Sequence, residues 1–319
     1  MVLACGLMIS LRIKCTTKLF YKVFCCVNFL RNRYCKYLFM NKFVGTVNAK
    51  HGIFNFCHFD EFIGLAIREY GEYSELELNT ILKFVKEGDT VFDIGANIGC
   101  FTVPIAKKVG LKGEVHSFEP QPFINKLLQK NTQLNNTYNV KINKQGLGLK
   151  EQIFELEDID YSSTGNFGGV GLITDNSSFT NLKSKRKHKI NVVKLDKFLH
   201  LNKCNFLKLD AENMDLDVLR GGKKFLKKFR PILWVENQKI YPNQINKFLL
   251  DNDYIPFWVS TMFYNPDNYF VNDNNYYKNL ATFNTLAIPN ENKFLIDDKE
   301  WFNEILDEYT QPLNVLTNL

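Results

Sequence analysis

Residues 91–99 read Val91-Phe92-Asp93-Ile94-Gly95-Ala96-Asn97-Ile98-Gly99, and this segment indicates the class of fold. The apolar residues predict a short buried strand ending at Ile94, and apolar residues at helical spacing from Ile98 predict a helix. A strand, a glycine turn and a helix in this order place the turn at the carboxyl end of a first strand, where open α/β sheets bind ligands. We expect Gly95 to let a ligand approach the backbone and Gly99 to let the helix pack closely.

Strand and helix patterns alternate on either side of this segment. Strands are predicted at 114–118, 140–144, 204–209, 231–235, 254–259 and 282–288, with helices at 78–85, 98–106, 122–134 and 215–229 and another ending near 249. This alternation predicts an α/β fold whose parallel sheet is covered on both faces. Segment 150–200 breaks the alternation and predicts a β-hairpin insertion. Its basic run, KSKRKHK at 183–189, is expected to be a solvated hairpin tip and not a nucleic-acid element.

The spacing of the glycines limits the class of ligand that the turn can bind. A dinucleotide fingerprint needs a glycine where Asn97 stands, and the chain has no phosphate-binding G-x-x-x-x-G-K-[ST] segment. Glu119 ends the second strand twenty residues after Gly99, where a carboxylate can accept both hydroxyls of a ribose. A nucleoside without a pyrophosphate, such as S-adenosylmethionine (SAM), satisfies both observations. The alternatives without a ligand are an ordinary tight turn for the glycines and a charge at a helix N-terminus for Glu119.

Several further segments carry a family resemblance, which covers about residues 71–289. They are GEYSELE at 71–77, GDTVFDIGANIGCFT at 88–102, SFEPQP at 117–122, Asn131 with Asn135, NFGG at 166–169, LKLDAENMDLDVLRGG at 207–222, PILWVEN at 231–237 and NTLAIP at 284–289. With these, the chain resembles the FkbM-type SAM-dependent methyltransferases, although Asn213 stands where a glycine is usual. The resemblance implies a Rossmann-like class I methyltransferase fold. Such a fold has a mostly parallel seven-stranded sheet with an antiparallel last strand, helices on both faces and, in this chain, the hairpin insertion.

The resemblance also implies the residues that hold SAM. Asp93, Gly95, Asn97 and Gly99 would lie at its methionine end, Glu119 would hold the ribose, Pro120 and Gln121 would flank the adenine, and Glu72 would approach from the segment before the first strand.

Acidic side chains follow two neighbouring central strands. Asp210 and Glu212 come after the fourth strand, and Glu236 with Asn237 after the fifth, so they are expected to meet across the methyl site. One of these carboxylates could act as a base with a raised pKa. Alternatively, Asp210, Glu236 and Asn237 could hold Mg²⁺, as in a loose likeness to catechol-type O-methyltransferases.

Two segments are expected to line the site of the methyl acceptor. NFGG at 166–169 would form one side, and residues 262–280, rich in aromatic and amide side chains, would form a lid suited to a carbohydrate. Ten asparagines lie between 251 and 300, which reflects either such binding or the base composition of the source genome. The sequence therefore predicts O-methylation of a sugar hydroxyl in a glycan or glycosylated metabolite. The alternatives are a nucleic-acid or other small-molecule methyltransferase and a non-catalytic SAM-binding module.

The first 45 residues differ from the rest. Residues 1–50 carry nine basic and no acidic side chains, while the remainder carries 31 basic and 34 acidic ones, so no nucleic-acid partner is expected.

Five of the eight cysteines lie in the first 35 residues. The scattered three that follow favour a reducing, cytoplasmic location and no zinc site. We expect residues 1–45 to be a disordered extension, or sequence upstream of a true start at Met40. The alternative is a membrane-surface anchor acylated at Cys25 and Cys26. The methyltransferase domain would span 46–290 and a C-terminal tail 291–319. The sequence gives no indication of an oligomeric state.

Overall fold

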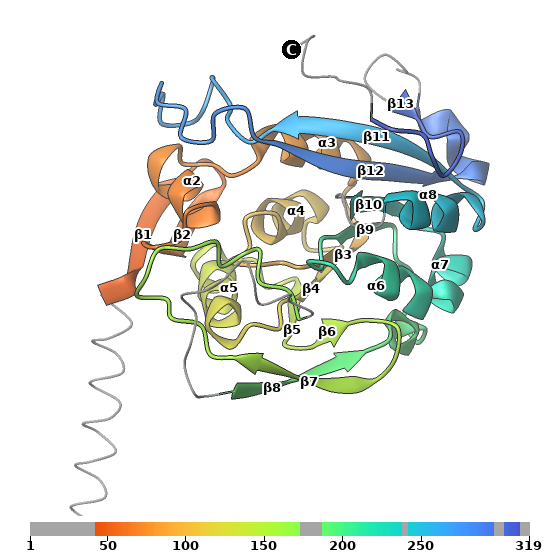
Figure 1. Cartoon of the computed structure of the whole chain (residues 1–319), viewed down its shortest axis with the longest axis horizontal. Coiled ribbons are helices and arrows are strands. Elements are labelled where there is room, and N and C mark those ends of the chain that lie inside the picture. Colours follow the sequence, from red (N-terminus) through yellow and green to blue (C-terminus); the bar gives the residue numbers. More distant parts are fainter. Residues whose placement is uncertain (1–41, 173–186, 238–241, 297–302, 313–319) are drawn as a thin grey trace, which may run out of the picture. The chain divides into compact units, whose positions relative to one another are not determined.

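The computed structural model describes residues 42–172, 187–237, 242–296 and 303–312. The chain divides into two compact units, Met1–Val44 and Gly45–Leu319. The second unit carries the predicted α/β fold (Figure 1). Among the described residues, no helix is both long and apolar enough to cross a membrane.

An eight-stranded sheet forms the centre of the second unit. Its strands, in spatial order, are β13 (Asn303–Glu304), β11 (Tyr254–Met262), β12 (Ala281–Pro289), β10 (Ile232–Glu236), β9 (Phe206–Leu209), β3 (Thr90–Ile94), β4 (Glu114–Phe118) and β5 (Val140–Asn143). The five strands from β10 to β5 are parallel, and β12 runs antiparallel to both of its neighbours. This is the predicted mostly parallel class I methyltransferase sheet with an antiparallel last long strand. The short strand β13 is an addition that brings part of the expected C-terminal tail to the sheet edge.

Two apolar layers cover the sheet because successive side chains of a strand point to opposite faces. In β10, Ile232 and Trp234 belong to the cluster formed with α3 (Glu75–Phe84) and α4 (Thr102–Val109). Leu233 and Val235 belong to the cluster on the other face. That face is covered by three helices, α6 (Asp215–Gly221), α7 (Lys223–Phe229) and α8 (Pro242–Leu250). Helix α5 (Pro122–Leu134) lies beside α4 (Figure 1).

The predicted hairpin insertion is part of a small second sheet. Strands β7 (Gln152–Glu157) and β8 (Lys187–Val193) pair antiparallel, and β6 (Gly146–Leu147) pairs parallel with β8. Residues 187–189 of the basic run lie within β8 and not at a tip, while residues 183–186 lie outside the described residues. A 3₁₀ helix, η1 (Leu195–Phe198), follows β8. A second one, η2 (Asn290–Leu295), follows β12.

Three elements before α3 were not predicted. They are β1 (Val44–Ala49), β2 (Gly52–Cys57) and the short helix α2 (Ile63–Glu69). Two asparagines one turn apart on α5 bind the backbone of β2. Asn131 accepts the N–H of Asn55 at 2.7 Å and donates to its carbonyl at 3.0 Å, and Asn135 bonds the same two groups of Ile53. These amides take the place of a neighbouring strand.

Candidate functional site

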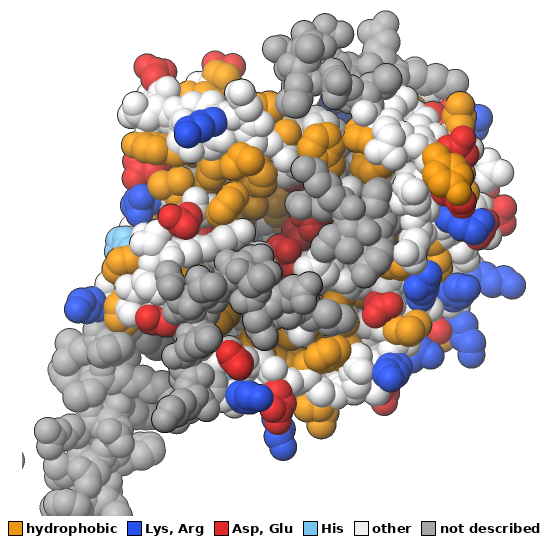
Figure 2. Space-filling view, viewed as in Figure 1, with side chains coloured by type: hydrophobic (Ala, Val, Ile, Leu, Met, Phe, Trp, Pro, Cys, Tyr) orange, Lys and Arg blue, Asp and Glu red, His pale blue; other side chains and the backbone are white. Residues whose placement is uncertain are grey.

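A cavity of about 410 Å³ opens at the carboxyl ends of β3, β4, β9 and β10. The strand order reverses between β3 and β9, and such a switch point is where open α/β sheets bind ligands. Figure 2 shows Asp and Glu side chains deep in the middle of this face, with apolar side chains beside them. The glycine turn, the end of β4, the turn after β9, the end of β10 and the NFGG segment all contribute to the lining.

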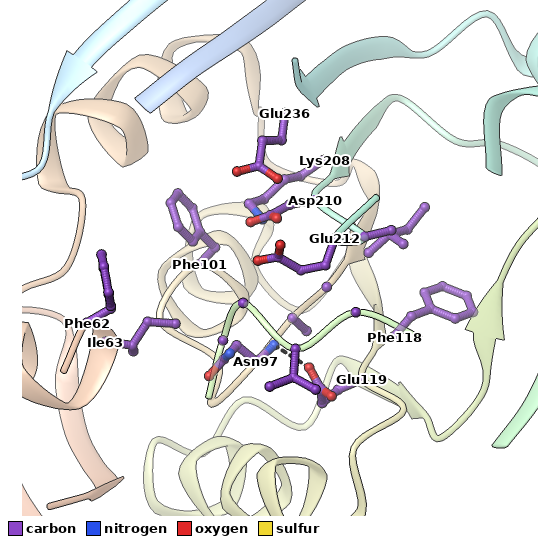
Figure 3. Close-up of a pocket in the computed structure, with 18 of the residues that line it drawn as sticks. Phe62, Ile63, Asn97, Phe101, Phe118, Glu119, Lys208, Asp210, Glu212 and Glu236 are labelled. Atoms are coloured by element: carbon purple, nitrogen blue, oxygen red, sulfur yellow. Dashed lines mark hydrogen bonds and ion pairs between the residues drawn. The ribbon is translucent and has the colours of Figure 1, made fainter. Parts of the chain in front are cut away.

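The glycine turn lines the cavity through Gly95 and Asn97. Gly95 has a φ of +79°, and a Cβ there would lie 1.8 Å from the carbonyl oxygen of Asp210. The backbone of the turn after β9 therefore requires a glycine at this position, for a reason that the sequence did not indicate. Asn97 adopts a left-handed φ of +48° and donates its N–H to Glu119 at 3.0 Å. This bond ties the first strand's turn to the end of the second (Figure 3).

Glu119 lies in the cavity wall with Pro120 and Gln121, as predicted. Its carboxylate also accepts the N–H of Gln121 at 2.8 Å. Burial raises the pKa of Glu119 to about 7, although the two backbone N–H groups act against the shift. A half-ionised acid with oxygen lone pairs facing the cavity can accept hydroxyl groups of a ligand.

Three of the expected ligand-binding residues do not line the cavity. Asp93 is fully buried, accepts the Thr102 hydroxyl at 2.5 Å and leaves its Oδ1 without a partner. Gly99 lies against α5, where a Cβ would come within 2.9 Å of Leu128. Glu72 points to the 263–280 loop, because its carboxylate accepts hydrogen bonds there. The segment around Glu72 does reach the cavity, but through Tyr73 and Glu77.

The predicted acidic cluster is present in part. Carboxylate oxygens of Asp210, Glu212 and Glu236 lie within 4.8 Å of one another and point into the same space (Figure 3). Burial, and then the charge of Asp210, raise the pKa of Glu212 to about 8. The same two causes raise the pKa of Glu236 well above its usual value. Close carboxylates of this kind hold a proton, because they cannot all ionise together without a cation.

Asn237 does not join this cluster. Its amide donates to Asn246 and to the hydroxyl of Thr285, both at 2.8 Å, on the far face of the sheet. Consecutive strand residues point to opposite faces, so Glu236 and Asn237 cannot share a metal from one side. Asn237 therefore does not belong to the expected set with Asp210 and Glu236; among the described residues, the carboxylates that lie together are those of Asp210, Glu212 and Glu236.

Lys208 is a cavity residue that sequence reasoning missed. It is buried, its ammonium lies 3.1 Å from the Asp210 carboxylate and it sits over the ring of Phe101 at 4.9 Å. Burial would lower its pKa, but the nearby charges of Asp210, Asp93 and Glu77 outweigh burial and raise it. The sequence could have indicated this position. A lysine inside an apolar strand, two residues before Asp210, lies on the same face as Asp210.

The turn after β9 has an uncommon backbone. Glu212 and Asn213 have φ values of +43° and +71°, which side chains other than glycine seldom adopt. Asparagine tolerates this conformation better than most side chains, so Asn213 can adopt it at a position where a glycine is usual. The turn presents the carboxylate of Glu212 to the cavity.

The chain has known relatives. A family profile described as the methyltransferase FkbM domain matches residues 93–256, just over half of the chain. "Methyltransferase 1" of Beauveria bassiana (strain ARSEF 2860) is 28% identical over 143 residues, covering 41% of this chain and 57% of that protein. The chain thus spans less than two thirds of that curated relative.

Solved structures are similar at lower identity. A methyltransferase FkbM from Methylobacillus flagellatus KT shows 16% identity over 62% of this chain and 43% of its own, with a TM-score of 0.40. TYW2 of M. jannaschii, solved with AdoMet, shows 11% identity over 77% of this chain and 84% of its own, with a TM-score of 0.38.

Proposed function

Since this chain belongs to the FkbM methyltransferase family, we propose that it is a SAM-dependent O-methyltransferase acting on a hydroxyl of a sugar, in a glycan or a glycosylated metabolite. The observation that carries the proposal is the meeting of Asp210, Glu212 and Glu236 in one cavity with Glu119 and the glycine turn. A hydroxyl nucleophile needs a proton acceptor, and these carboxylates supply one beside a nucleoside-type site.

The cavity fits SAM by the chemistry of its residues. Glu119 would accept the ribose hydroxyls, Pro120 and Gln121 would flank the adenine, and the turn at Gly95 and Asn97 would face the methionine part. When bound, SAM supplies a sulfonium methyl group with a good leaving group, so that positioning provides much of the rate. We expect micromolar affinity for SAM and no binding of NAD, which calorimetry with both ligands measures.

The protein's own contribution is to receive the proton of the acceptor hydroxyl. SAM would supply the methyl group for the acceptor oxygen, and a carboxylate of Asp210, Glu212 or Glu236 would receive the hydroxyl proton. The ammonium of Lys208 lies 3.1 Å from the Asp210 carboxylate, so a positive charge faces the acidic cluster. The three carboxylates also offer the oxygen ligands that Mg²⁺ prefers, so a cation is the alternative way to hold this charge.

Two substitutions test the role of the cluster. Asp210→Asn and Glu236→Gln should each leave SAM affinity within a few-fold and lower turnover about 10²-fold or more. The assay follows labelled methyl transfer from SAM to a panel of methyl glycosides. Glu114→Gln, which removes a partly exposed carboxylate outside the cavity, serves as the control and should keep full turnover.

A chelator distinguishes the two chemical forms of the site. If a carboxylate alone is the base, the chelator leaves the parent rate unchanged; if Mg²⁺ takes part, it abolishes that rate. Near-normal turnover in both Asp210→Asn and Glu236→Gln would remove these residues from the mechanism. Lack of transfer to any sugar by the parent, with transfer to another acceptor, would contradict the substrate class.

A further inference from the structure

The loop between β11 and β12, residues 263–280, is held against α2 along much of its length. The N–H of Phe270 donates to the carbonyl of Tyr70 at 3.1 Å. The Tyr70 hydroxyl donates to the carbonyl of Asn274 at 2.8 Å and accepts the N–H of Tyr276 at 2.9 Å. Figure 1 shows the loop, in blue, beside α2, in orange. The predicted lid is therefore built as a fixed wall, tied to a segment nearly 200 residues away.

Glu72 is the charged residue at the centre of the contact between residues 263–280 and the α2 segment. Its carboxylate accepts the side-chain amide of Asn265 at 2.7 Å and the backbone N–H of Tyr269 at 3.1 Å. It is only 4% exposed, and Lys50 approaches it at 3.5 Å. A buried carboxylate that receives donors from two positions of one loop fixes that loop strongly, because each charge-assisted bond is about twice as strong as a neutral one.

The fixed loop completes a row of aromatic rings in the cavity. Phe263, at the start of the loop, lies 6.2 Å from the ring of Phe62 and 6.2 Å from that of Tyr73. Tyr73 in turn lies edge-on to Phe101 at 6.2 Å. All four line the same cavity as the carboxylate cluster, and Figure 3 shows Phe62 at the far side from Glu212. The row offers an apolar surface beside the acids.

We propose that Glu72 is a positioning residue for the acceptor: by fixing residues 263–280 it holds Phe263 in an aromatic wall on which the C–H face of a sugar ring packs. This inference rests on the proposed function for the identity of the acceptor. It differs from the role that the sequence suggested for Glu72, because the residue acts on the acceptor side and not on SAM. The wall and the carboxylates together present a sugar hydroxyl to the base.

Binding of sugars, measured separately from methyl transfer, tests the proposal. Saturation-transfer NMR would follow a panel of methyl glycosides on the full chain with S-adenosylhomocysteine present. Glu72→Gln places an amide donor among the loop donors and should weaken glycoside binding about tenfold or more, while S-adenosylhomocysteine affinity stays within two-fold. Phe263→Ala should have the same effect, because it removes the ring itself. Hydrogen exchange in residues 263–280 should rise in Glu72→Gln but not elsewhere in the domain.

Glu75→Gln is the matched control. Glu75 is also buried and also pairs with Lys50, at 3.0 Å, and its second partner is His51, which lies outside the loop. It should leave glycoside affinity and loop exchange unchanged. Equal weakening in Glu72→Gln and Glu75→Gln, equal loss of S-adenosylhomocysteine binding, or no glycoside binding by the parent would each overturn the proposal. Glycoside binding that depends on Glu72 without any methyl transfer would instead overturn the proposed function alone.

Discussion

At the residue scale, Gly95 has no room for a side chain. Its Cβ would lie 1.8 Å from the carbonyl oxygen of Asp210. We therefore expect Gly95→Ala to displace the turn after β9 and to weaken SAM binding at least tenfold in calorimetry. Gly88 provides the control, since it also has a positive φ, +85°, but has no atom within 4 Å of its Cβ position. Gly88→Ala should cost about 1–2 kcal/mol of stability and leave SAM affinity unchanged; equal loss of binding in both would implicate backbone strain alone.

We expect Glu119 to give SAM binding a pH dependence. Its pKa in the free protein is about 7, raised first by burial. Ribose hydroxyls donate to the ionised form, so binding favours deprotonation and affinity rises with pH. We expect the Kd for SAM to fall about tenfold between pH 6 and pH 8 and to level off above that. Glu119→Gln should bind more weakly throughout, and its binding should lose this dependence. A parent whose Kd does not change over this range would contradict the assigned role.

Residue-level predictions from the sequence succeeded where the position in a strand decides the outcome. Asp210, Glu212 and Glu236 meet because the carboxyl ends of parallel strands lie along one edge. Asn237 was placed wrongly, although the alternation of side chains along a strand could have excluded it. Glu72 precedes α3 in an irregular segment, where no periodicity indicates the direction of a side chain.

At the scale of elements, the side chains of Asn131 and Asn135 hold β2 in place. Asn131 is fully buried and also donates to the carbonyl of Ile98 at 2.8 Å. Asn131→Ala would leave buried backbone groups without partners, at about 1–3 kcal/mol for each. We expect denaturant unfolding to show such a loss, and Asn135→Ala, in a more exposed place, to show a smaller one. Equal effects would mean that burial does not set the cost.

Long patterned elements were predictable, and short ones were not. The strands and helices from α3 onward carry apolar residues at a clear period of two or 3.6. Strands β1 and β2 are six residues each, with glycine and asparagine in place of a regular apolar pattern. They pair only with each other, and the amides of Asn131 and Asn135 bond the backbone of β2. The many asparagines near the C-terminus have a local structural use. In the 263–280 loop, Asn268 donates to the carbonyl of Asn272 and accepts its N–H at 3.0 Å, which stabilises a turn.

At the scale of the whole molecule, the described residues that line the cavity all belong to the second unit. Its lining residues begin at Phe62 and end at Asn284. Removing residues 1–39 should therefore leave SAM affinity unchanged, as calorimetry on the shortened chain would measure. Precipitation of that chain, or a loss of binding, would show instead that the basic segment supports the domain.

The bond between Glu72 and Asn265 forms late during synthesis of the chain, because its partners are 193 residues apart in the sequence. A ribosome adding about 5–20 residues per second needs roughly 10–40 s to travel that distance. Throughout this interval Glu72 lacks its bond to Asn265, and the aromatic row lacks the ring of Phe263. The acceptor side of the cavity is consequently incomplete until the loop between β11 and β12 has been synthesised.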